Sequence, residues 1–575
     1  MILPRHLRDP LLRSLVALVV ALVAFDARAA FPRPVHADQG MVVSADLRAS
    51  EAGVEVLRKG GNAVDAAVAT TFAISVTEPY SAGIGGGGFL LLHLEDKGEL
   101  YALDFRERAP LAATRDMYLD ESGKVRPGAS TDGYLSVAVP GTVAGMWDVH
   151  KRHGKLPWAE VVAPAIRLAE QGIVVDELWV RAVEWRKDVL TRYPAARAIF
   201  TNDGAPHAPG DVVVQKDLAA TLRRIAKDPT DFYTGVTARA IVKDMAAHGG
   251  LVTAEDLKAY KPTWRRPVCG PFRGHQVCSM PPPSSGGVHL LEILNLLEPY
   301  DLKALGYNHP DALHYMIEAM RIAYADRATH LGDPAFTDVP VPALISKGYA
   351  DKRRKEIDPK KARRSDDVKA GTQAQLAAAR ESKDTSHLTV VDKDRNAVSL
   401  TFTVNYGFGS GVVVPGTGVL LNDEMDDFSA APGTPNAYGL VGGEANAIAP
   451  AKIPLSSMTP TVVTKRGKLR LAAGSPGGST IITTSLQLVL NVVEHGMDAG
   501  AAVAAPRIHH QWLPDKTMIE MWGLDPLTRQ ELMRRGHLLE PRGSGWGNGN
   551  LIVVTDDGQL EGAADPRGSG AAVGY

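Results

Sequence analysis

A threonine at the junction between a charged segment and an apolar strand pattern is the feature that most constrains this chain. Residues 351–383 are rich in charged side chains and hold almost no large apolar residue after Ile357, which is typical of solvated helix or coil. From Thr385 the sequence reads TSHLTVVDKDRNAVSLTFTVN, two runs of strand-forming residues separated by turn residues. The pattern predicts a β-hairpin whose first strand begins at Thr385.

The hydroxyl of Thr385 becomes chemically useful if the chain is cut directly before it. Threonine is a weak nucleophile, and an N-terminal α-amino group is one known way to supply its base. The pKa of such an amine, about 7.7–8.0, leaves a useful neutral fraction near pH 7. An internal threonine lacks this amine, so the peptide bond between Asp384 and Thr385 must break first. Taken alone, this segment is better explained as an ordinary strand with one more β-branched residue.

A glycine-containing turn supplies candidate donors for a developing negative charge. The sequence GSPGGST, residues 474–480, precedes an apolar run that predicts a helix ended by Gly496. Gly477 and Gly478 would then lie at a helix N-terminus, where backbone N–H groups suit an oxyanion. A tight turn that merely feeds a helix explains the segment equally well. No lysine follows these glycines, which disfavours a phosphate-binding loop.

Three polar motifs carry groups that fit a small charged ligand. DFRER at residues 104–108 offers Arg106, LLNDEMDDFS at residues 420–429 gathers four carboxylates, and KIPLSSM at residues 452–458 offers two adjacent hydroxyls. Each motif alone is more often a surface ion pair or a solvated turn.

In order and spacing, these motifs together resemble the γ-glutamyltranspeptidase family of N-terminal nucleophile hydrolases. The resemblance extends over nearly the whole chain after its first residues and rests on these segments: DFRERAP, GIGGGGF, MPPPSSGG, DTSHLTVVDKDRNAVSLTFTVN, LLNDEMDDFS, PLSSMTPT and GSPGGS. It implies an α+β fold, the four-layer αββα sandwich of that superfamily. Helix and strand periodicity alone cannot choose this sandwich over other α+β arrangements.

The resemblance also implies catalytic roles. Thr385 would first attack the carbonyl of Asp384, which makes this bond the cleavage site, and would then attack the γ-carbonyl of the substrate with its freed amine as base. Thr403 would hold the nucleophile in place from the second strand of the hairpin. The amides of Gly477 and Gly478 would bind the oxyanion, a contribution of roughly 2.7–4 kcal/mol per donor in comparable sites.

The implied substrate pocket complements a zwitterion. The group that would hold the glutamyl α-carboxylate consists of Arg106, Ser456 and Ser457, since a guanidinium fork suits a carboxylate. The group that would hold the α-ammonium consists of Asn405, Glu424 and Asp427. Glu424 departs from the amide that many bacterial relatives carry, and its extra negative charge is expected to tune affinity for the amino end. Tyr438, in the Gly- and Pro-rich residues 432–450, matches a lid aromatic, although disorder is the competing interpretation.

The domain boundaries follow from the leader and the predicted cut. Residues 1–29 carry arginines, an apolar run and a small-residue site, typical of a signal peptide, with an uncleaved anchor as the alternative. Residues 30–384 would form a large subunit and residues 385–575 a small catalytic subunit, the two making one composite domain. We expect an exported protein, periplasmic or secreted, without a membrane segment in its mature form.

Composition limits the remaining choices. The chain has 575 residues, 45% hydrophobic and 22% charged, and a net charge of −2, which gives no reason to expect nucleic acid as a partner. No metal-ligand spacing is present, and GIGGGGF opens into a strand-like run, so we expect a close backbone approach and no cofactor. Cys269 and Cys278 flank a turn and predict a hairpin disulfide, with two buried thiols as the alternative.

The sequence therefore predicts an autoprocessed γ-glutamyltransferase and hydrolase, with glutathione and related γ-glutamyl compounds as donors and amino acids, peptides or water as acceptors. A glutaryl acylase of the same superfamily and a non-catalytic exported binding protein are the alternatives. The implied ammonium site, formed by Asn405, Glu424 and Asp427, argues against the acylase, which needs no such site. The intact set of Thr385, Thr403 and the two glycines argues against the binding protein.

Overall fold

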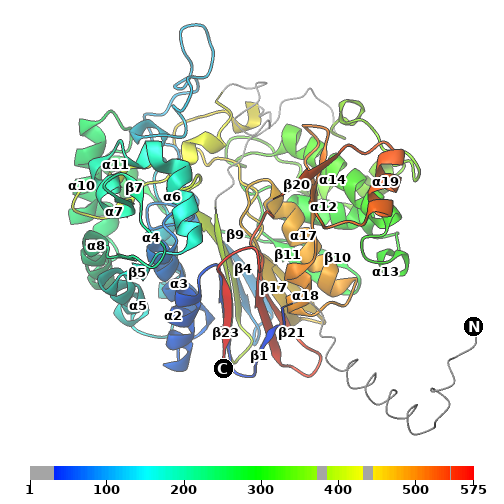
Figure 1. Ribbon diagram of the computed structural model, residues 1–575, viewed down its shortest axis with the longest axis horizontal. Coiled ribbons are helices and arrows are strands. Elements are labelled where there is room, and N and C mark those ends of the chain that lie inside the picture. Colours follow the sequence, from blue (N-terminus) through cyan, green and yellow to red (C-terminus); the bar gives the residue numbers. More distant parts are fainter. Residues whose placement is uncertain (1–31, 372–384, 431–443, 544) are drawn as a thin grey trace, which may run out of the picture.

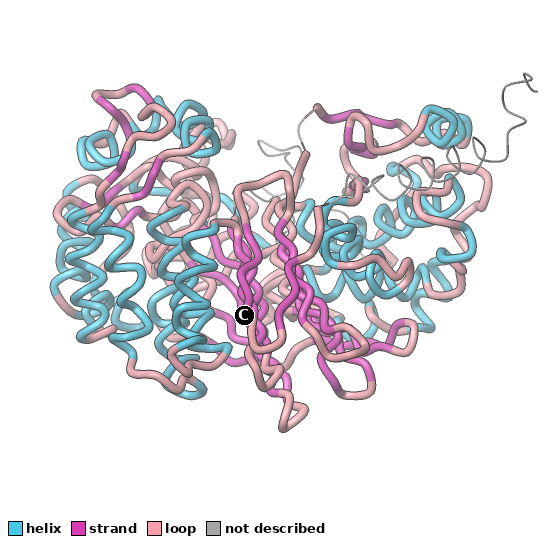
Figure 2. Tube along the Cα trace, turned by 60° about the horizontal axis from the view of Figure 1, so that its bottom comes forward, coloured by secondary structure: helices cyan, strands magenta, loops and turns pink. Residues whose placement is uncertain are grey.

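The computed structural model describes residues 32–371, 385–430, 444–543 and 545–575, which fold into four layers. Two seven-stranded sheets face each other in the middle, and helices cover the outer face of each sheet (Figure 1). Turned by 60°, the molecule shows both sheets between the two helical layers (Figure 2). The α+β sandwich expected from the resemblance is confirmed.

The first sheet contains the predicted hairpin at its centre. Its strand order is β23 (Ala571–Gly574), β2 (Met41–Ser44), β12 (Ser386–Val391), β13 (Ala397–Thr403), β3 (Gly87–Leu94), β4 (Glu99–Asp104) and β9 (Thr263–Arg265). The hairpin pairs antiparallel with Leu388 opposite Leu400, and Asp392 caps its turn by accepting hydrogen bonds from the N–H groups of Asp394 and Asn396. This sheet contains strands from both sides of Thr385, so a cut before Thr385 leaves the two pieces interleaved.

The second sheet also mixes segments from both sides of Thr385. Its order is β1 (Val35–Ala37), β22 (Leu560–Ala564), β21 (Asn550–Val554), β17 (Lys468–Gly474), β16 (Thr461–Lys465), β11 (His275–Ser279) and β10 (Val268–Phe272). Its central strands β21, β17 and β16 come from the part of the chain after Thr385, whereas β1, β10 and β11 come from the part before it.

Strand alternation divides the apolar side chains among three cores. In β12, Leu388 and Val390 face the first helical layer, whereas Val391 packs between the sheets with Met41 and Ile552. Side chains of successive strand residues point to opposite faces. The helical layer over the second sheet buries a separate core that includes Leu290, Ile317, Leu486 and strand residues of β17.

The helices of the first layer come mostly from the first half of the chain. They are α2 (Leu47–Arg58), α3 (Ala63–Thr77), α4 (Thr142–His153), α5 (Trp158–Gln171), α6 (Glu177–Leu190), α8 (Lys216–Lys227) and α10 (Val236–Ala247). Every residue of α3 is buried, and Asn62 begins it with a capping box. Val212–Val213 forms strand β8, which pairs with β5 (Ile173–Val174) just before α8 begins.

The second layer contains α12 (Gly286–Leu297), α14 (Pro310–His330), α17 (Thr480–Val493) and α18 (Ala499–Ala504). Helix α17 ends at Val493, three residues before the glycine expected to end it. Among the described helices, none is long and apolar enough to cross a membrane.

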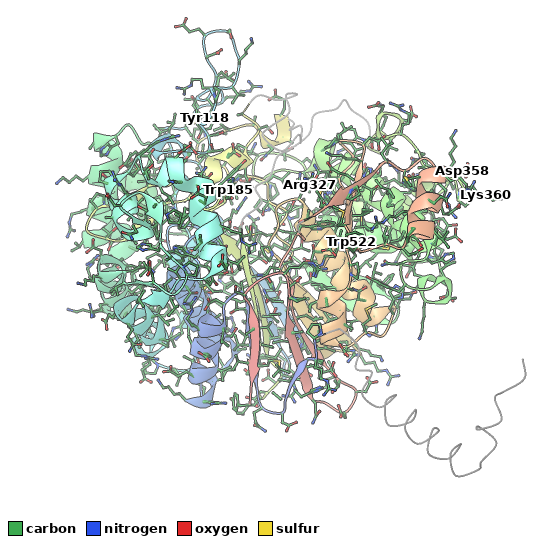
Figure 3. All side chains as sticks on the ribbon, viewed as in Figure 1. Tyr118, Trp185, Arg327, Asp358, Lys360 and Trp522 are labelled. Atoms are coloured by element: carbon green, nitrogen blue, oxygen red, sulfur yellow. A yellow bond between two sulfur atoms is a disulfide. The ribbon has the colours of Figure 1, made fainter. Side chains whose placement is uncertain are left out.

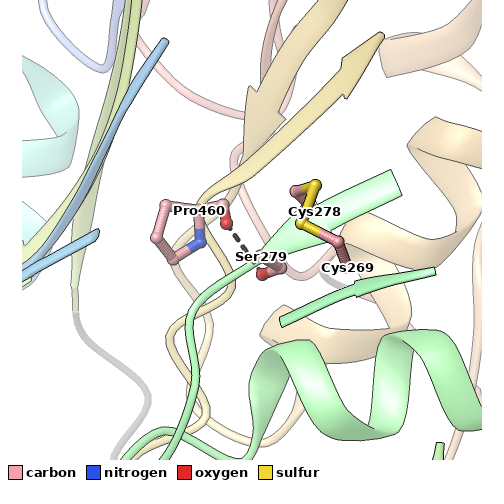
Figure 4. The surroundings of a disulfide bond; sticks show 4 residues. All are labelled: Cys269, Cys278, Ser279 and Pro460. Carbon is pink, nitrogen blue, oxygen red and sulfur yellow. Dashed lines mark hydrogen bonds between the residues drawn. A yellow bond between two sulfur atoms is a disulfide. The ribbon is translucent and has the colours of Figure 1, made fainter. Parts of the chain in front are cut away.

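A disulfide joins neighbouring strands of the second sheet. Cys269 of β10 and Cys278 of β11 are direct partners in the strand register, with Cα atoms 4.1 Å apart, and their sulfurs are bonded (Figure 4). The next residue, Ser279, donates a hydrogen bond to the carbonyl oxygen of Pro460 at 2.7 Å, which ties β11 to the segment leading into β16.

The part of the predicted linker that the structure describes is solvated along most of its length but anchored at a few buried residues. We call residues 355–371 the strap. Within it, Val368 is fully buried and Ile357 is 8% exposed. Trp512 donates its indole N–H to the carbonyl oxygens of Ser365 and Val368. Most charged side chains of the strap are exposed, as expected of a solvated segment. Its few apolar residues are buried, however, and Arg363 forms an ion pair with the buried Glu318.

Candidate active site

Thr385 lies at the start of the central hairpin. It directly precedes β12, and the pairing of Ser386 with Phe402 places it opposite Thr403, the last residue of β13. Its Oγ1 donates a hydrogen bond to Thr403 Oγ1 at 3.4 Å, and the side chain is 8% exposed. Thr403 Oγ1 also accepts the N–H of Asn405 at 2.8 Å. The threonine expected to hold the nucleophile therefore contacts it.

Asn405 adopts a backbone conformation that favours this contact. Its φ is 80°, in the left-handed region where asparagine is one of the few tolerated non-glycine residues. Its side-chain amide donates to the carbonyl oxygen of Asp423 at 3.0 Å. The bend directs the chain from the end of β13 toward the acidic segment η4 (Glu424–Asp427).

The glycine run before β3 lets two backbones approach each other beside the pocket. A Cβ on Gly86 would lie 1.9 Å from the carbonyl oxygen of Thr403, and a Cβ on Gly85 would lie 2.0 Å from that of Leu420. No side chain fits at either position. The predicted close approach is confirmed. The glycine run allows the ends of β13 and β15 (Val419–Leu420) to pack directly against its backbone.

Gly477 and Gly478 lie just before α17, as the sequence predicts. Their φ values are 130° and 58°, both unfavourable for residues with a Cβ. Their carbonyl oxygens accept the first-turn N–H groups of Thr480 and Ile481 at 3.1 and 3.0 Å. Gly478 lines the pocket that also contains Thr385.

One wall of the pocket is charged and almost completely buried. Arg106, 1% exposed, follows β4 and forms ion pairs with both Glu424 and Asp427, while Glu107 Oε2 lies 3.8 Å from its Nη1. We call these four residues the pocket cluster. Burial raises the pKa of Glu424 well above its usual range, although the charge of Arg106 lowers it. Burial also raises the pKa of Glu107 to about 7.

The opposite wall presents two hydroxyls on a rigid backbone. Ser456 forms a parallel bridge with Ser284, and the carbonyl oxygen of Ser456 accepts hydrogen bonds from the backbone N–H and the hydroxyl of Ser285 at 2.7 and 2.8 Å. The MPPPSSGG motif therefore supports the segment that carries Ser456 and Ser457.

The structure brings nearly all the predicted residues to one small pocket. Its free volume is about 10 Å3, enough for about one water molecule, and it is lined by Arg106, Thr385, Thr403, Asn405, Glu424, Asp427, Ser456, Ser457, Met458, Gly478 and Ile481. Gly477 adjoins this set through Gly478. Asp384 and Tyr438 lie outside the described residues. No group of three metal-ligating side chains occurs in the described ranges.

Comparison with known proteins agrees with this geometry. The model of the family described as Gamma-glutamyltranspeptidase matches residues 49–575. The chain belongs to the γ-glutamyltranspeptidase family. A "Glutathione hydrolase proenzyme" of Escherichia coli (strain K12) is 47% identical over 93% of this chain and 91% of its own length. An "Acylase ACY 1 proenzyme" of Pseudomonas sp. (strain V22) is 40% identical over 94% of each chain.

Solved structures of related proteins have the same fold. Cephalosporin acylase from Bacillus halodurans superimposes with a TM-score of 0.83 at 31% identity, covering 96% of this chain and 98% of that one. The γ-glutamyltranspeptidase of Helicobacter pylori gives a TM-score of 0.56 at 44% identity, covering 60% of this chain and 97% of the solved chain.

Three residues of this γ-glutamyltranspeptidase site escaped the sequence analysis. Met458 and Ile481 line the pocket, but apolar residues beside a motif give no signal of their own. Arg327 is 3% exposed and donates to Ser457 Oγ at 3.2 Å. A buried arginine within helix α14 (Pro310–His330) is unusual.

Proposed function

We propose that this chain is an autoprocessed γ-glutamyltransferase and hydrolase that uses Thr385 as its nucleophile. The observation that carries the proposal is the pairing of a hydroxyl nucleophile with a pocket cluster holding one buried arginine and three carboxylates. A γ-glutamyl group ends in a carboxylate and an ammonium on one carbon. A pocket with both signs of charge complements this zwitterion, whereas a purely apolar or singly charged pocket does not.

Processing comes first in the proposed sequence of steps. Thr385 Oγ1 adds to the carbonyl carbon of Asp384, the C–N bond breaks, and the nitrogen becomes the α-amino group of Thr385. Water then opens the ester and leaves Asp384 as a C-terminal residue. The products would be residues 30–384 and 385–575, held together because both sheets contain strands from each piece.

Catalysis then reuses the same oxygen. The α-amine of Thr385 takes the hydroxyl proton as Oγ1 attacks the γ-carbonyl, and the leaving amine receives that proton. Thr403 holds Oγ1, and the amides at Gly477 and Gly478 bind the oxyanion. An amino acid, a peptide or water then attacks the γ-glutamyl ester and restores Thr385. Glutathione is the donor we propose, since its glutamyl group carries both charges.

Substrate binding would exchange partners within the pocket cluster. The α-carboxylate would pair with Arg106 and the hydroxyls of Ser456 and Ser457, while the α-ammonium would pair with Glu424 and Asp427. Ion pairs that hold the empty pocket together are thereby replaced by pairs with the ligand, so no charge is left buried and unpaired. Residues 1–29 would direct export, placing the mature enzyme in the periplasm or outside the cell.

The acylases among the relatives supply the competing activity. A glutaryl group lacks the ammonium, so its acylase has no use for the acidic residues Glu424 and Asp427. We therefore expect preference for γ-glutamyl over glutaryl amides.

The test is release of p-nitroaniline from the γ-glutamyl and glutaryl anilides by the purified protein, with and without a dipeptide acceptor. A new N-terminus reading Thr-Ser-His-Leu-Thr, absent in Thr385→Ala, is expected together with γ-glutamyl release accelerated by the acceptor. Faster release from the glutaryl anilide by a cut chain would establish the acylase instead. An uncut, inactive wild-type chain would contradict the enzyme altogether.

A further inference from the structure

A second buried arginine lies behind the hydroxyl wall of the pocket. Arg327 is in the last turn of α14 and is 3% exposed. Figure 3 labels it in the upper middle of the view. Its Nε donates to Ser285 Oγ at 2.9 Å and its Nη2 to Ser457 Oγ at 3.2 Å. One guanidinium thus contacts both the pocket hydroxyl and the residue that supports its backbone.

The direction of these hydrogen bonds decides what Ser457 can do. A guanidinium has donors only, so Ser457 Oγ must be the acceptor. A hydroxyl has a single O–H, which is then left to donate elsewhere. Ser456 is in the same situation, since its Oγ accepts the N–H of Met458 at 3.1 Å. Neither hydroxyl donates to another described residue, and both line the pocket.

The charge of Arg327 strengthens this arrangement. A hydrogen bond from a cation withdraws electron density from the hydroxyl oxygen and makes its O–H a better donor. On the opposite wall, the positive charge of Arg106 is already shared between Glu424 and Asp427. The hydroxyl wall therefore has its own cation, which acts on the pocket through Ser457.

We propose that Arg327 is a positioning and specificity residue that acts through Ser457 to select donors carrying an α-carboxylate. The inference rests on the proposed γ-glutamyl activity and assigns the carboxylate subsite two arginines, one in direct contact and one acting through a hydroxyl. It requires that Arg327 affect donors with a carboxylate and leave donors without one unchanged.

Three anilide donors separate this role from a structural one. γ-Glutamyl p-nitroanilide carries both charges, glutaryl p-nitroanilide carries only the carboxylate, and 4-aminobutanoyl p-nitroanilide carries only the ammonium. For Arg327→Met we expect kcat/KM to fall roughly ten- to hundredfold for the two donors with a carboxylate, mainly through KM. We expect the value for 4-aminobutanoyl p-nitroanilide to stay within twofold. An equal loss for all three donors would overturn the proposal.

Double variants test whether the effect passes through Ser457. Arg327→Met should cost little further in a Ser457→Ala background, because the hydroxyl through which it acts is gone. In a Ser456→Ala background the two losses should multiply, since Arg327 does not contact that hydroxyl. Multiplying losses with Ser457→Ala would contradict the proposal.

A conservative variant covers the case in which Arg327→Met does not fold or mature. Arg327→Lys keeps the charge but cannot reach Ser285 and Ser457 with one planar fork. It should show a smaller loss with the same dependence on the carboxylate, and uniform loss would again overturn the role. Failure of the proposed function can be told apart from failure of the Arg327 proposal. If the proposed function is wrong, the wild-type chain itself releases nothing from γ-glutamyl p-nitroanilide.

Discussion

This protein contains two buried groups of arginines and carboxylates. They differ in how many of their polar atoms have a hydrogen-bond partner within the protein. The pocket cluster lies at the end of the central hairpin, and a second group, which we call the strap cluster, holds residues 355–371 to α14. The strap cluster consists of Glu318, Arg321, Arg363 and Asp515. Arg321 and Glu318 are 2% and 0% exposed, which is as deeply buried as the pocket cluster. Arg363 and Asp515 are 17% and 29% exposed.

In the strap cluster nearly every donor meets an acceptor. Arg321 donates to Glu318, to Ser365 Oγ at 3.2 Å, and to His510 and Asp515 at 3.1 and 3.2 Å. Both carboxylate oxygens of Glu318 accept hydrogen bonds, one from Arg363 Nε at 2.8 Å. Such a network fixes one arrangement of the chain and offers nothing to a ligand.

In the pocket cluster the same kinds of side chain are left short of partners. Arg106 Nε, both carboxylate oxygens of Glu107 and Glu424 Oε2 have no hydrogen-bond partner among the described residues. Glu424 Oε1 contacts Arg106 in an ion pair. Buried groups in this state are costly unless something completes them. The contrast indicates that a structural ion pair differs from a ligand site mainly in whether its polar atoms already have hydrogen-bond partners. Burial and charge distinguish the two less well.

The largest effect is expected on the free energy of unfolding when a residue of the strap cluster is replaced. Arg321→Met leaves Glu318 buried with one partner fewer, which should cost about 3–5 kcal/mol of unfolding free energy. Denaturant unfolding measures this loss, while kcat/KM per folded molecule should change little. Arg364→Met is the matched control, because Arg364 is 77% exposed in its pair with Asp366 and should cost at most about 1 kcal/mol. Equal losses in the two variants would remove the contrast.

The complementary change in the pocket cluster should act on catalysis. Arg106→Met removes the cation proposed for the α-carboxylate and should lower kcat/KM for γ-glutamyl p-nitroanilide about a hundredfold. Stability should fall less than in Arg321→Met, because Glu424, with its raised pKa, takes up a proton rather than remaining an unpaired charge. Steady-state kinetics and unfolding on the same sample check both parts. A larger stability loss here than in Arg321→Met would break the comparison.

A smaller effect is expected on the pH dependence of binding. Because the pKa of Glu424 is raised, its ionised fraction grows as pH rises, and KM for a γ-glutamyl donor should fall over that range. Glu107, with a pKa of about 7, contributes in the same direction. Glu424→Gln should raise KM about tenfold at the alkaline end and flatten its pH profile. Unchanged KM for both enantiomers of the donor would rule out contact with the ammonium.

The smallest effect concerns a buried carboxyl pair beside the strap. Burial raises the pKa of Glu292 to about 7 and that of Asp326 to about 8; Asp326 accepts hydrogen bonds from Tyr349 and from the N–H of Gly371 at 2.6 and 2.8 Å. The folded state holds protons that the unfolded state releases near pH 4, so this stability is present at low pH and is lost as pH rises through 7 and 8.

For Glu292→Gln we therefore expect a Tm that falls less between pH 5 and pH 8 than in the wild type, by a few degrees. The control variant Glu298→Gln, at a residue 35% exposed in its ion pair with Lys347, should follow the wild-type profile. Identical profiles for Glu292→Gln and the wild type would show that the pair does not take up a proton on folding.

Much of the site was predictable because its residues lie in short motifs. The hairpin, the turn before α17 and the acidic segment were each visible in local patterns, and the structure places Thr385, Thr403 and Gly478 at one pocket. The anchoring of the strap was not predicted because it depends on Trp512 and Glu318, which lie outside the strap in the sequence. Arg327 was missed for the same reason, since its partner Ser457 is 130 positions away.

The sequence by itself determined which chemical groups this protein carries and the local elements that hold them, because capping, turn and strand preferences act over a few residues. Only the tertiary structure decided which buried charged groups have hydrogen-bond or ion-pair partners. That question depends on contacts between segments hundreds of residues apart, such as Arg106 with Asp427 across 321 positions. Hydrogen-bond satisfaction is a property of three-dimensional neighbours, and no local pattern of residues encodes it.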